Sequence, residues 1–570
     1  MRNAYDTSGK DFATPMHRVA SHSPSREKST VDTFPALVDA FVVSGAALNI
    51  AGHGCAHGFP AVLFAQLKAD GGPVTLTDHD TSWIASVVGV MGIVGNFISP
   101  ILMTKFGRQK AHLISTVPAL LGWIVFVIGN TVPAFILARL LHGLALGLRT
   151  PLAAILVAEY TEPKYRGAFL GTFAISLGLG ILLSHVWGAH LTWKMTSVVC
   201  SMFPLIAMTI ISLSPESSSW LVSKGKFDEA RKAFVWVRGN GEAEKQELEA
   251  LIKAQEREQT LEHNTIKVMK KFRWKNIIRS IINPLKTVLK IFKKKEFYKP
   301  SIIAISMLIV FEFGGAHMVP AYGNLILQAV LDKKELSDVT WQFTVIDLLR
   351  TICALLAIFL LKNFKRRTIL FTSGVMTVFS LSAVSVFMYL RNAGIFADGW
   401  VLDVIPMGLM ILYTLSFCLG LVPLNWVICG EVFPLAYRSL GSTLSTSFLT
   451  PSFVVSMKTA PHLYSSIGVE GAFLVYSATL TVCLLIMYAL LPETKDRTLQ
   501  DIEESFKDNL TYLLRWRIDP KWDLASDTRD RQSRLSCAFS CQSIACNSRR
   551  SSFTASRQQY LGRLTDGYRW

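Results

Sequence analysis

Long apolar stretches alternate with short polar ones along almost the whole chain. A membrane-spanning helix needs about 20 apolar residues, and twelve stretches are long enough. The first six cover 36–66, 82–104, 111–130, 132–158, 167–187 and 194–214. The second six cover 300–331, 340–362, 367–390, 402–430, 439–466 and 470–491. The pattern therefore predicts an all-α membrane protein whose twelve transmembrane helices form two pseudo-symmetric six-helix halves.

The longest polar interval between apolar stretches separates these two series. We expect a cytoplasmic N-terminal tail (1–35), a first half (36–214), a cytoplasmic linker (215–299), a second half (300–491) and a cytoplasmic C-terminal tail (492–570). Mixed charge at helical spacing, as in FDEARKAFVWVRG, predicts short amphipathic helices in the linker.

Composition agrees with a membrane protein. Of the 570 residues 51% are hydrophobic and only 17% are charged, whereas about a quarter are charged in soluble proteins. The net charge of +17 comes from Lys and Arg in loops on the face that carries both termini, and positive loops stay cytoplasmic. We find no recognised nucleic-acid motif, so we expect the lipid bilayer and a small-molecule substrate as partners, and no nucleic acid. The sequence leaves protein partners unknown.

Three short charged motifs occur in the same order in both halves. TKFGRQK corresponds to LKNFKRRT, AEYTEPKYRG to GEVFPLAYRS, and PESSSWL to PETKDRTL. Such ordered pairs at a nearly constant offset indicate an internal duplication.

The repeated motifs place charged residues at the cytoplasmic ends of the predicted helices. Opposite charges at the ends of two packed halves can pair when those ends meet and separate when they part. We therefore expect them to form a cytoplasmic gate. The gate residues are Arg108, Glu159, Arg166 and Glu216 in the first half and Arg366, Glu431, Arg438 and Glu493 in the second.

The same motifs, together with RLLHGLALG and KTAPHL, resemble those of the sugar porter family of the major facilitator superfamily, most closely the insect facilitated trehalose transporters. The resemblance extends from Phe34 to Phe506. It implies a plasma-membrane carrier of trehalose or a hexose that works by alternating access. The sequence lacks a nucleotide-binding P-loop and a zinc-like cysteine spacing, so we expect no cofactor and no metal. No group of nucleophile, base and oxyanion donor indicates an enzyme.

The predicted sugar pocket departs from the family pattern. Ala174 stands where the family usually has Gln, Glu312 replaces a second Gln, and His317 replaces an Asn, whereas Trp426 is kept. The residues that we expect to bind substrate are Ala174, Glu312, His317, Tyr322, Asn324, Asn425 and Trp426, together with Arg149 and Arg350.

Three of these residues place a charge near the middle of the membrane: Arg149, Glu312 and Arg350. A charge facing lipid there costs about 2.5 to 3.5 kcal/mol, so these side chains should point inward and pair. We expect Arg149 to pair with Glu312. We also expect Arg350 to pair with Asp347, which lies three residues away on the same helix face.

Several interpretations remain open at this point. The buried charges can form a structural salt bridge, recognise a charged substrate, or carry a proton on Glu312 and His317. The membrane histidines His53, His57, His142 and His185 are expected to be packed and hydrogen-bonded. The alternatives to a sugar carrier are a carrier of an organic anion or other charged small molecule and a non-transporting sensor with the same fold.

Overall fold

The structure is a computed structural model. It describes residues 33–68, 74–161, 166–239, 241–242, 245–249, 252–253, 294–333, 337–395, 401–433, 438–495, 502 and 506. The chain divides into two compact units, Met1–Ile502 and Glu503–Trp570, and every element discussed below belongs to the first. Most of the two predicted tails and the basic part of the predicted linker lie outside the described residues.

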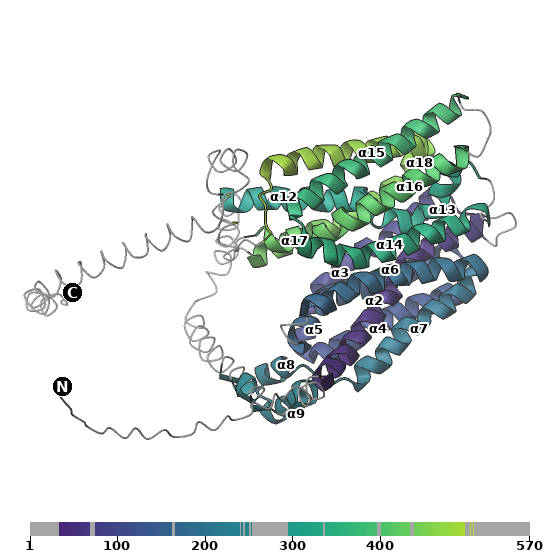
Figure 1. Ribbon diagram of the computed structural model, residues 1–570. Coiled ribbons are helices and arrows are strands. Elements are labelled where there is room, and N and C mark those ends of the chain that lie inside the picture. The colour runs from purple at the N-terminus through teal and green to yellow at the C-terminus, as the bar shows by residue number, and fades with distance from the viewer. Residues whose placement is uncertain are drawn as a thin grey trace, which may run out of the picture. The chain divides into compact units, whose positions relative to one another are not determined.

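Helices are the only regular secondary structure in the described part of the chain (Figure 1). The first half contains α2 (Thr33–Lys68), α3 (Asp78–Phe106), α4 (Arg108–Ile128), α5 (Val132–Tyr160), α6 (Arg166–His190) and α7 (Trp193–Leu213). Two short helices follow, α8 (Ser218–Ser223) and α9 (Phe227–Arg238). The second half contains α12 (Lys295–Phe313), α13 (Met318–Leu331), α14 (Ser337–Asn363), α15 (Arg366–Asn392), α16 (Val401–Ser416), the π-helical turn η2 (Phe417–Leu421), α17 (Val422–Glu431) and α18 (Arg438–Leu490).

The second half also makes six passes, although its helices are interrupted. Helix α12 continues as α13 after a turn at 314–317, and α16 continues through η2 into α17. Helix α18 is two passes joined at Gly468, whose φ of 74° is a conformation that glycine adopts readily. By length and hydropathy, ten helical stretches of the described chain can span a membrane, one of them containing both arms of α18. With α2, the structure confirms the predicted all-α fold of twelve passes.

Successive passes run in opposite directions, which defines two ends of the bundle. We call the end next to α8 and α9 the linker end and the opposite end the far end (Figure 1). Helix α9 packs against the start of α2, where the Trp236 ring lies 6.4 Å from the Phe41 ring. The buried Arg238 and Asp39 approach to 4.0 Å in the same contact. The short helices therefore anchor the linker to the first half.

Glycines permit close packing inside the first half. A Cβ atom on Gly147 of α5 would lie 2.7 Å from both the Gly95 Cα and the Asn96 nitrogen of α3. Only a residue without a side chain permits this approach of two helix backbones. The two halves contact each other through α2 and α13, α3 and α18, and α6 and α14. These contacts bring residues far apart in sequence to the axis between the halves.

Candidate functional site

The gate residues of the first half form a compact cluster at the linker end. The Arg108 guanidinium binds the Glu159 carboxylate with Nη2 to Oε1 at 2.7 Å and Nε to Oε2 at 2.9 Å. The Ser217 hydroxyl also donates to Glu159. The fork of an Arg side chain fits a carboxylate in this bidentate way, so the arrangement fixes both side chains.

Glu216 caps a helix rather than pairing with an arginine side chain. Its Oε1 accepts from the backbone N–H groups of Arg108 at 2.6 Å, Gln109 at 3.1 Å and Ser217 at 2.9 Å. Arg108 and Gln109 begin α4, where the first N–H groups have no partner within the helix. A carboxylate there also interacts favourably with the positive end of the helix dipole.

Glu493 repeats this arrangement in the second half. Its carboxylate accepts from the backbone N–H groups of Arg366 at 3.0 Å and Arg367 at 3.1 Å, at the start of α15. It also accepts from those of Thr494 and Lys495. The Arg366 Nη2 lies 3.4 Å from Glu431 Oε1, so this ion pair is looser than its counterpart in the first half.

In this structure the predicted gate residues that are described make their contacts within each half, and the opening and closing of the gate stays a prediction. Glu216 and Glu493 are helix caps, and the Arg108–Glu159 and Arg366–Glu431 pairs each join residues of one half. In the described part of the chain, no ion pair joins these two clusters. The side chains of Arg166 and Arg438 lie outside the described residues.

Glu312 is the most deeply buried carboxylate of the predicted pocket. It lies near the end of α12, and its Oε2 is 3.0 Å from Nδ1 of His317, which precedes α13. Its Oε1 is buried without a hydrogen-bond partner among the described atoms. The predicted pairing with Arg149 is wrong, since the Arg149 Nη1 donates to the backbone carbonyl of Asn49 at 3.2 Å.

The second predicted pairing is also wrong. Asp347 binds His185 rather than Arg350, with 2.5 Å between Asp347 Oδ2 and His185 Nδ1. Arg350 donates to the carbonyl of Ala316. The expectation that His185 is packed and hydrogen-bonded is confirmed, but the sequence did not identify Asp347 as its partner.

A row of imidazole rings connects the two halves near Glu312. The His53 and His57 rings of α2 lie 4.3 Å apart, and His57 lies 4.7 Å from His317 of the second half. The Phe453 ring of α18 contacts both His57 and His317, at 5.9 and 5.1 Å. The expected packing is thus confirmed for His53 and His57, which are buried, whereas His53 Nε2 has no hydrogen-bond partner among the described atoms.

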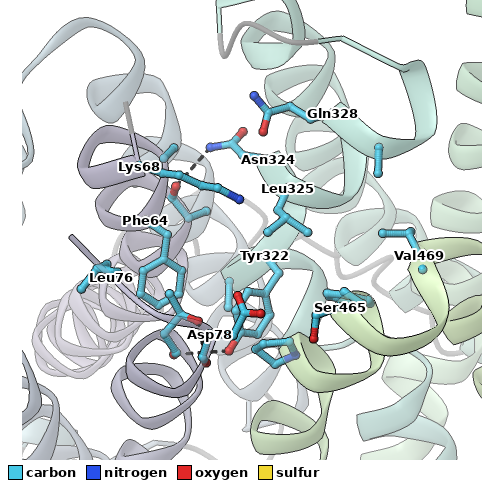
Figure 2. A pocket seen from close by; sticks show the side chains of 18 of the residues that line it. Phe64, Lys68, Leu76, Asp78, Tyr322, Asn324, Leu325, Gln328, Ser465 and Val469 are labelled. Carbon is cyan, nitrogen blue, oxygen red and sulfur yellow. Dashed lines mark hydrogen bonds between the residues drawn. The ribbon is translucent and has the colours of Figure 1, made fainter. Parts of the chain in front are cut away.

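A cleft of about 610 Å³ lies between the halves at the far end. Figure 2 shows side chains of α2 and α3, such as Phe64, facing those of α13 and α18. Tyr322 and Asn324, which the sequence predicted as binding residues, line this cleft. Among the lining residues that sequence reasoning missed are Gln328 and Ser465, which carry no signal beyond a polar position in an apolar helix.

Hydrogen bonds across the cleft hold the halves together. The Asn324 amide donates to the carbonyl of Ala61 in α2 at 3.3 Å. The Tyr322 hydroxyl lies 3.5 Å from the Thr81 carbonyl in α3, and its ring stacks on Phe64 at 5.8 Å. Both residues therefore connect the halves as well as line the cleft.

The remaining predicted binding residues occupy different surroundings. Trp426 of α17 is 56% exposed, and its ring lies 6.1 Å from Phe311. Asn425 is fully buried, whereas Ala174 is exposed on α6. None of these three residues lines the far-end cleft.

Twelve passes in two halves, with a cleft between the halves and the same charge cluster repeated in each, define a secondary carrier of the major facilitator superfamily. The chain belongs to the sugar transporter family, because residues 13–506 match the family model described as "Sugar (and other) transporter".

Named relatives agree with this membership. The facilitated trehalose transporter Tret1 of Culex quinquefasciatus is 26% identical over 483 residues, which cover 84% of this chain and 87% of that protein. Tret1 of Apis mellifera ligustica is 25% identical over 472 residues, with coverages of 82% and 88%. The inward open structure of the xylose transporter XylE from E. coli matches with a TM-score of 0.62 and 15% identity, covering 83% of this chain and 100% of that one. The chain is thus a multi-pass membrane carrier of the sugar-transporter fold.

Proposed function

We propose that this protein carries trehalose or a hexose across the plasma membrane by alternating access, with the linker end and both termini in the cytoplasm. The observation that carries the proposal is the far-end cleft, because residues of both halves line it. The halves 36–214 and 300–491 move as two bodies about this cleft and the buried residues next to it. The relatives named as trehalose transporters supply the substrate class.

The contacts between the halves support a state closed at the far end. Asn324 and Tyr322 bond across the cleft, whereas the linker-end ion pairs each remain within one half. Opening the far end breaks the Asn324 and Tyr322 bonds. Each is worth about 0.5 to 1.5 kcal/mol, which is small enough for a two-state carrier to exchange between its forms.

The cleft has the size and chemistry for a sugar. Its volume of about 610 Å³ falls in the range of small-molecule sites. Tyr322, Asn324, Gln328 and Ser465 offer neutral hydrogen-bonding groups, and Phe64 offers an aromatic face. The charged residues that also line the cleft are two of each sign, namely Lys68, Lys333, Asp78 and Glu470. Neutral donors and acceptors suit a polyol, which carries no charge. The relatives are transporters, and we infer that this chain catalyses no covalent reaction.

One observation favours the alternative of an organic anion. Arg149 and Arg350 donate to backbone carbonyls, and neither forms an ion pair with a described carboxylate. Two guanidinium groups without a carboxylate partner can bind an anionic substrate. The test below therefore includes anions as competitors.

The test is counterflow of labelled trehalose and glucose into vesicles that hold the purified protein. We expect saturable counterflow of at least one of the two sugars. Tyr322→Phe removes the hydroxyl that contacts Thr81 and should change the counterflow rate by up to about tenfold. Tyr389→Phe is the matched control, because Tyr389 is exposed on α15. Absence of sugar counterflow, together with exchange of small organic anions, would overturn the sugar assignment.

A further inference from the structure

One buried ion pair joins the two halves. His185 lies on α6 of the first half and Asp347 on α14 of the second, with side chains only 3% and 1% exposed. Their Nδ1 and Oδ2 atoms are 2.5 Å apart. Within the described part of the chain, the other ion pairs join residues of a single half or involve the linker. The His185–Asp347 pair is therefore the electrostatic contact that depends on how the halves meet.

Both ring nitrogens of His185 face oxygen atoms. Nδ1 faces the Asp347 carboxylate, and Nε2 lies 2.9 Å from the backbone carbonyl oxygen of Gly58. A neutral imidazole has one N–H and can donate only one of these bonds, while a carbonyl can only accept. Both hydrogen bonds can form at once only if a proton is added to the combination of a neutral His185 and an ionised Asp347. The geometry thus requires a bound proton.

The surroundings of the pair are largely apolar or already engaged. The Phe343 ring lies 4.5 Å from the His185 ring. On α14, Arg350 follows Asp347 by one turn and donates to Ala316. Cys418 of η2 lies near Asp347 together with Arg350 and Cys353. His57, which precedes Gly58 in α2, lies near Arg139 and Arg149 of α5, Arg350, and His317, which pairs with Glu312.

None of these neighbouring charged groups can take the place of the additional proton between His185 and Asp347. Arginines repel a proton, and Glu312 is already bound to His317. The Asp347 Oδ1 atom is itself buried without a described partner. The attraction that holds the proton therefore comes from Asp347 and the Gly58 carbonyl.

We propose that His185 and Asp347 form a proton-binding site that locks the far end closed. This inference rests on the alternating access of the proposed function. When the far end opens, α14 moves away from α6, and His185 and Asp347 each face water alone. Once the pair separates, the His185 ring no longer faces both oxygen atoms, so the arrangement that needs the additional proton is lost.

The proton balance of the step is simple. On closing, a proton from water on the far side forms the second N–H bond of His185, and the ring donates to Asp347. On opening, this N–H bond breaks and the proton returns to the same water. Since the closed form binds one proton more, acid on the far side favours closure, with a change of up to about tenfold per pH unit in the ratio of open to closed forms.

The test uses a cysteine reporter at Ala61. This residue lines the cleft, is 1% exposed, and its carbonyl accepts from the Asn324 amide, so we expect its labelling rate to rise when the far end opens. Ala61→Cys protein in sealed vesicles is treated with a membrane-impermeant maleimide on the far side between about pH 6 and about pH 8. At each pH, the labelling rate is divided by the rate measured for the same Ala61→Cys reporter in the His185→Gln variant. This ratio removes the pH dependence that comes from ionisation of the reporter thiol.

We expect this ratio to fall severalfold as the pH is lowered. Asp347→Asn should behave like His185→Gln and so give a flat ratio. His112→Gln is the matched control, because His112 is equally buried but lies on α4, and it should keep the slope of the parent protein. If His185→Gln does not fold, Asp347→Asn serves as the divisor.

Each outcome decides one question. A flat ratio in the parent protein, or the parent slope retained in Asp347→Asn, overturns the proton site. Sugar counterflow with a flat ratio leaves the proposed function intact and rejects only the site. A pH-dependent ratio without sugar counterflow supports the site and rejects the sugar assignment.

Discussion

The helix cap made by Glu216 leads to a quantitative prediction. Glu216→Ala removes one oxygen that accepts three backbone N–H groups at 2.6 to 3.1 Å. Two of these groups begin α4 and have no other partner within the helix. Loss of a cap costs about 0.5 to 2 kcal/mol, and loss of the carboxylate from the helix dipole adds about 0.3 to 1 kcal/mol.

Partial solvent access reduces this sum, because water can replace some of the lost bonds. We therefore expect Glu216→Ala to lower the free energy of unfolding by about 2 kcal/mol. Glu216→Gln keeps one carbonyl oxygen and loses the charge, so it should cost about half as much. Glu493→Ala should behave alike, and the two losses should add, because the caps lie in different halves.

The assay is thermal unfolding of the purified protein in detergent, followed by tryptophan fluorescence. Glu229→Ala is the control, since this carboxylate is 59% exposed and pairs with Lys226 on the surface. Such a pair contributes at most about 1 kcal/mol. The reasoning is refuted if Glu216→Ala unfolds at the same temperature as Glu229→Ala, or if the Gln variant is the less stable of the two Glu216 variants.

Three further predictions follow from packing and burial. Gly147→Ala should lower the free energy of unfolding by about 1 to 3 kcal/mol and lower the unfolding temperature, because the added Cβ would lie 2.7 Å from the α3 backbone. The control Gly408→Ala adds a Cβ into open space and should not lower the unfolding temperature. Glu312→Gln should leave the unfolding temperature within a few degrees, since an amide still contacts His317 and removes a buried charge; a large fall would show that the charge itself stabilises the pair. Trp426→Ala should leave the sugar concentration for half-maximal counterflow unchanged, since Trp426 does not line the far-end cleft, and a severalfold rise would place the sugar site beyond that cleft.

The apolar pattern was sufficient to predict the twelve passes. A segment in lipid must satisfy its backbone groups internally, so an apolar stretch of sufficient length forms a helix whatever its neighbours are. The interruptions of the second half were not predicted. The turn at 314–317 and the π turn η2 lie inside apolar stretches, where hydropathy does not change.

The repeated motifs placed Arg108 and Glu159, and likewise Arg366 and Glu431, at the same helix ends. They did not predict that each pair forms within one half. The motifs did not show that Glu216 and Glu493 bind backbone N–H groups, since capping depends on the path of the chain after α7 and α18.

The pairing of the buried charges could be seen only in three dimensions. Helical spacing made Asp347 and Arg350 partners, yet Asp347 contacts His185, which is 162 residues away. Spacing tells which residues share a helix face, but not which residue of another helix lies opposite. That choice depends on how α6 and α14 pack, through close contacts spread along both helices.

The sequence by itself therefore determined the twelve passes, their duplication and the family, because these depend on local hydropathy and on short motifs. The tertiary structure alone decided which buried groups meet between the halves, including the His57–His317 ring contact and the His185–Asp347 pair. The physical reason is that burial forces a charged group to find a partner, while helix packing decides which partner is within reach.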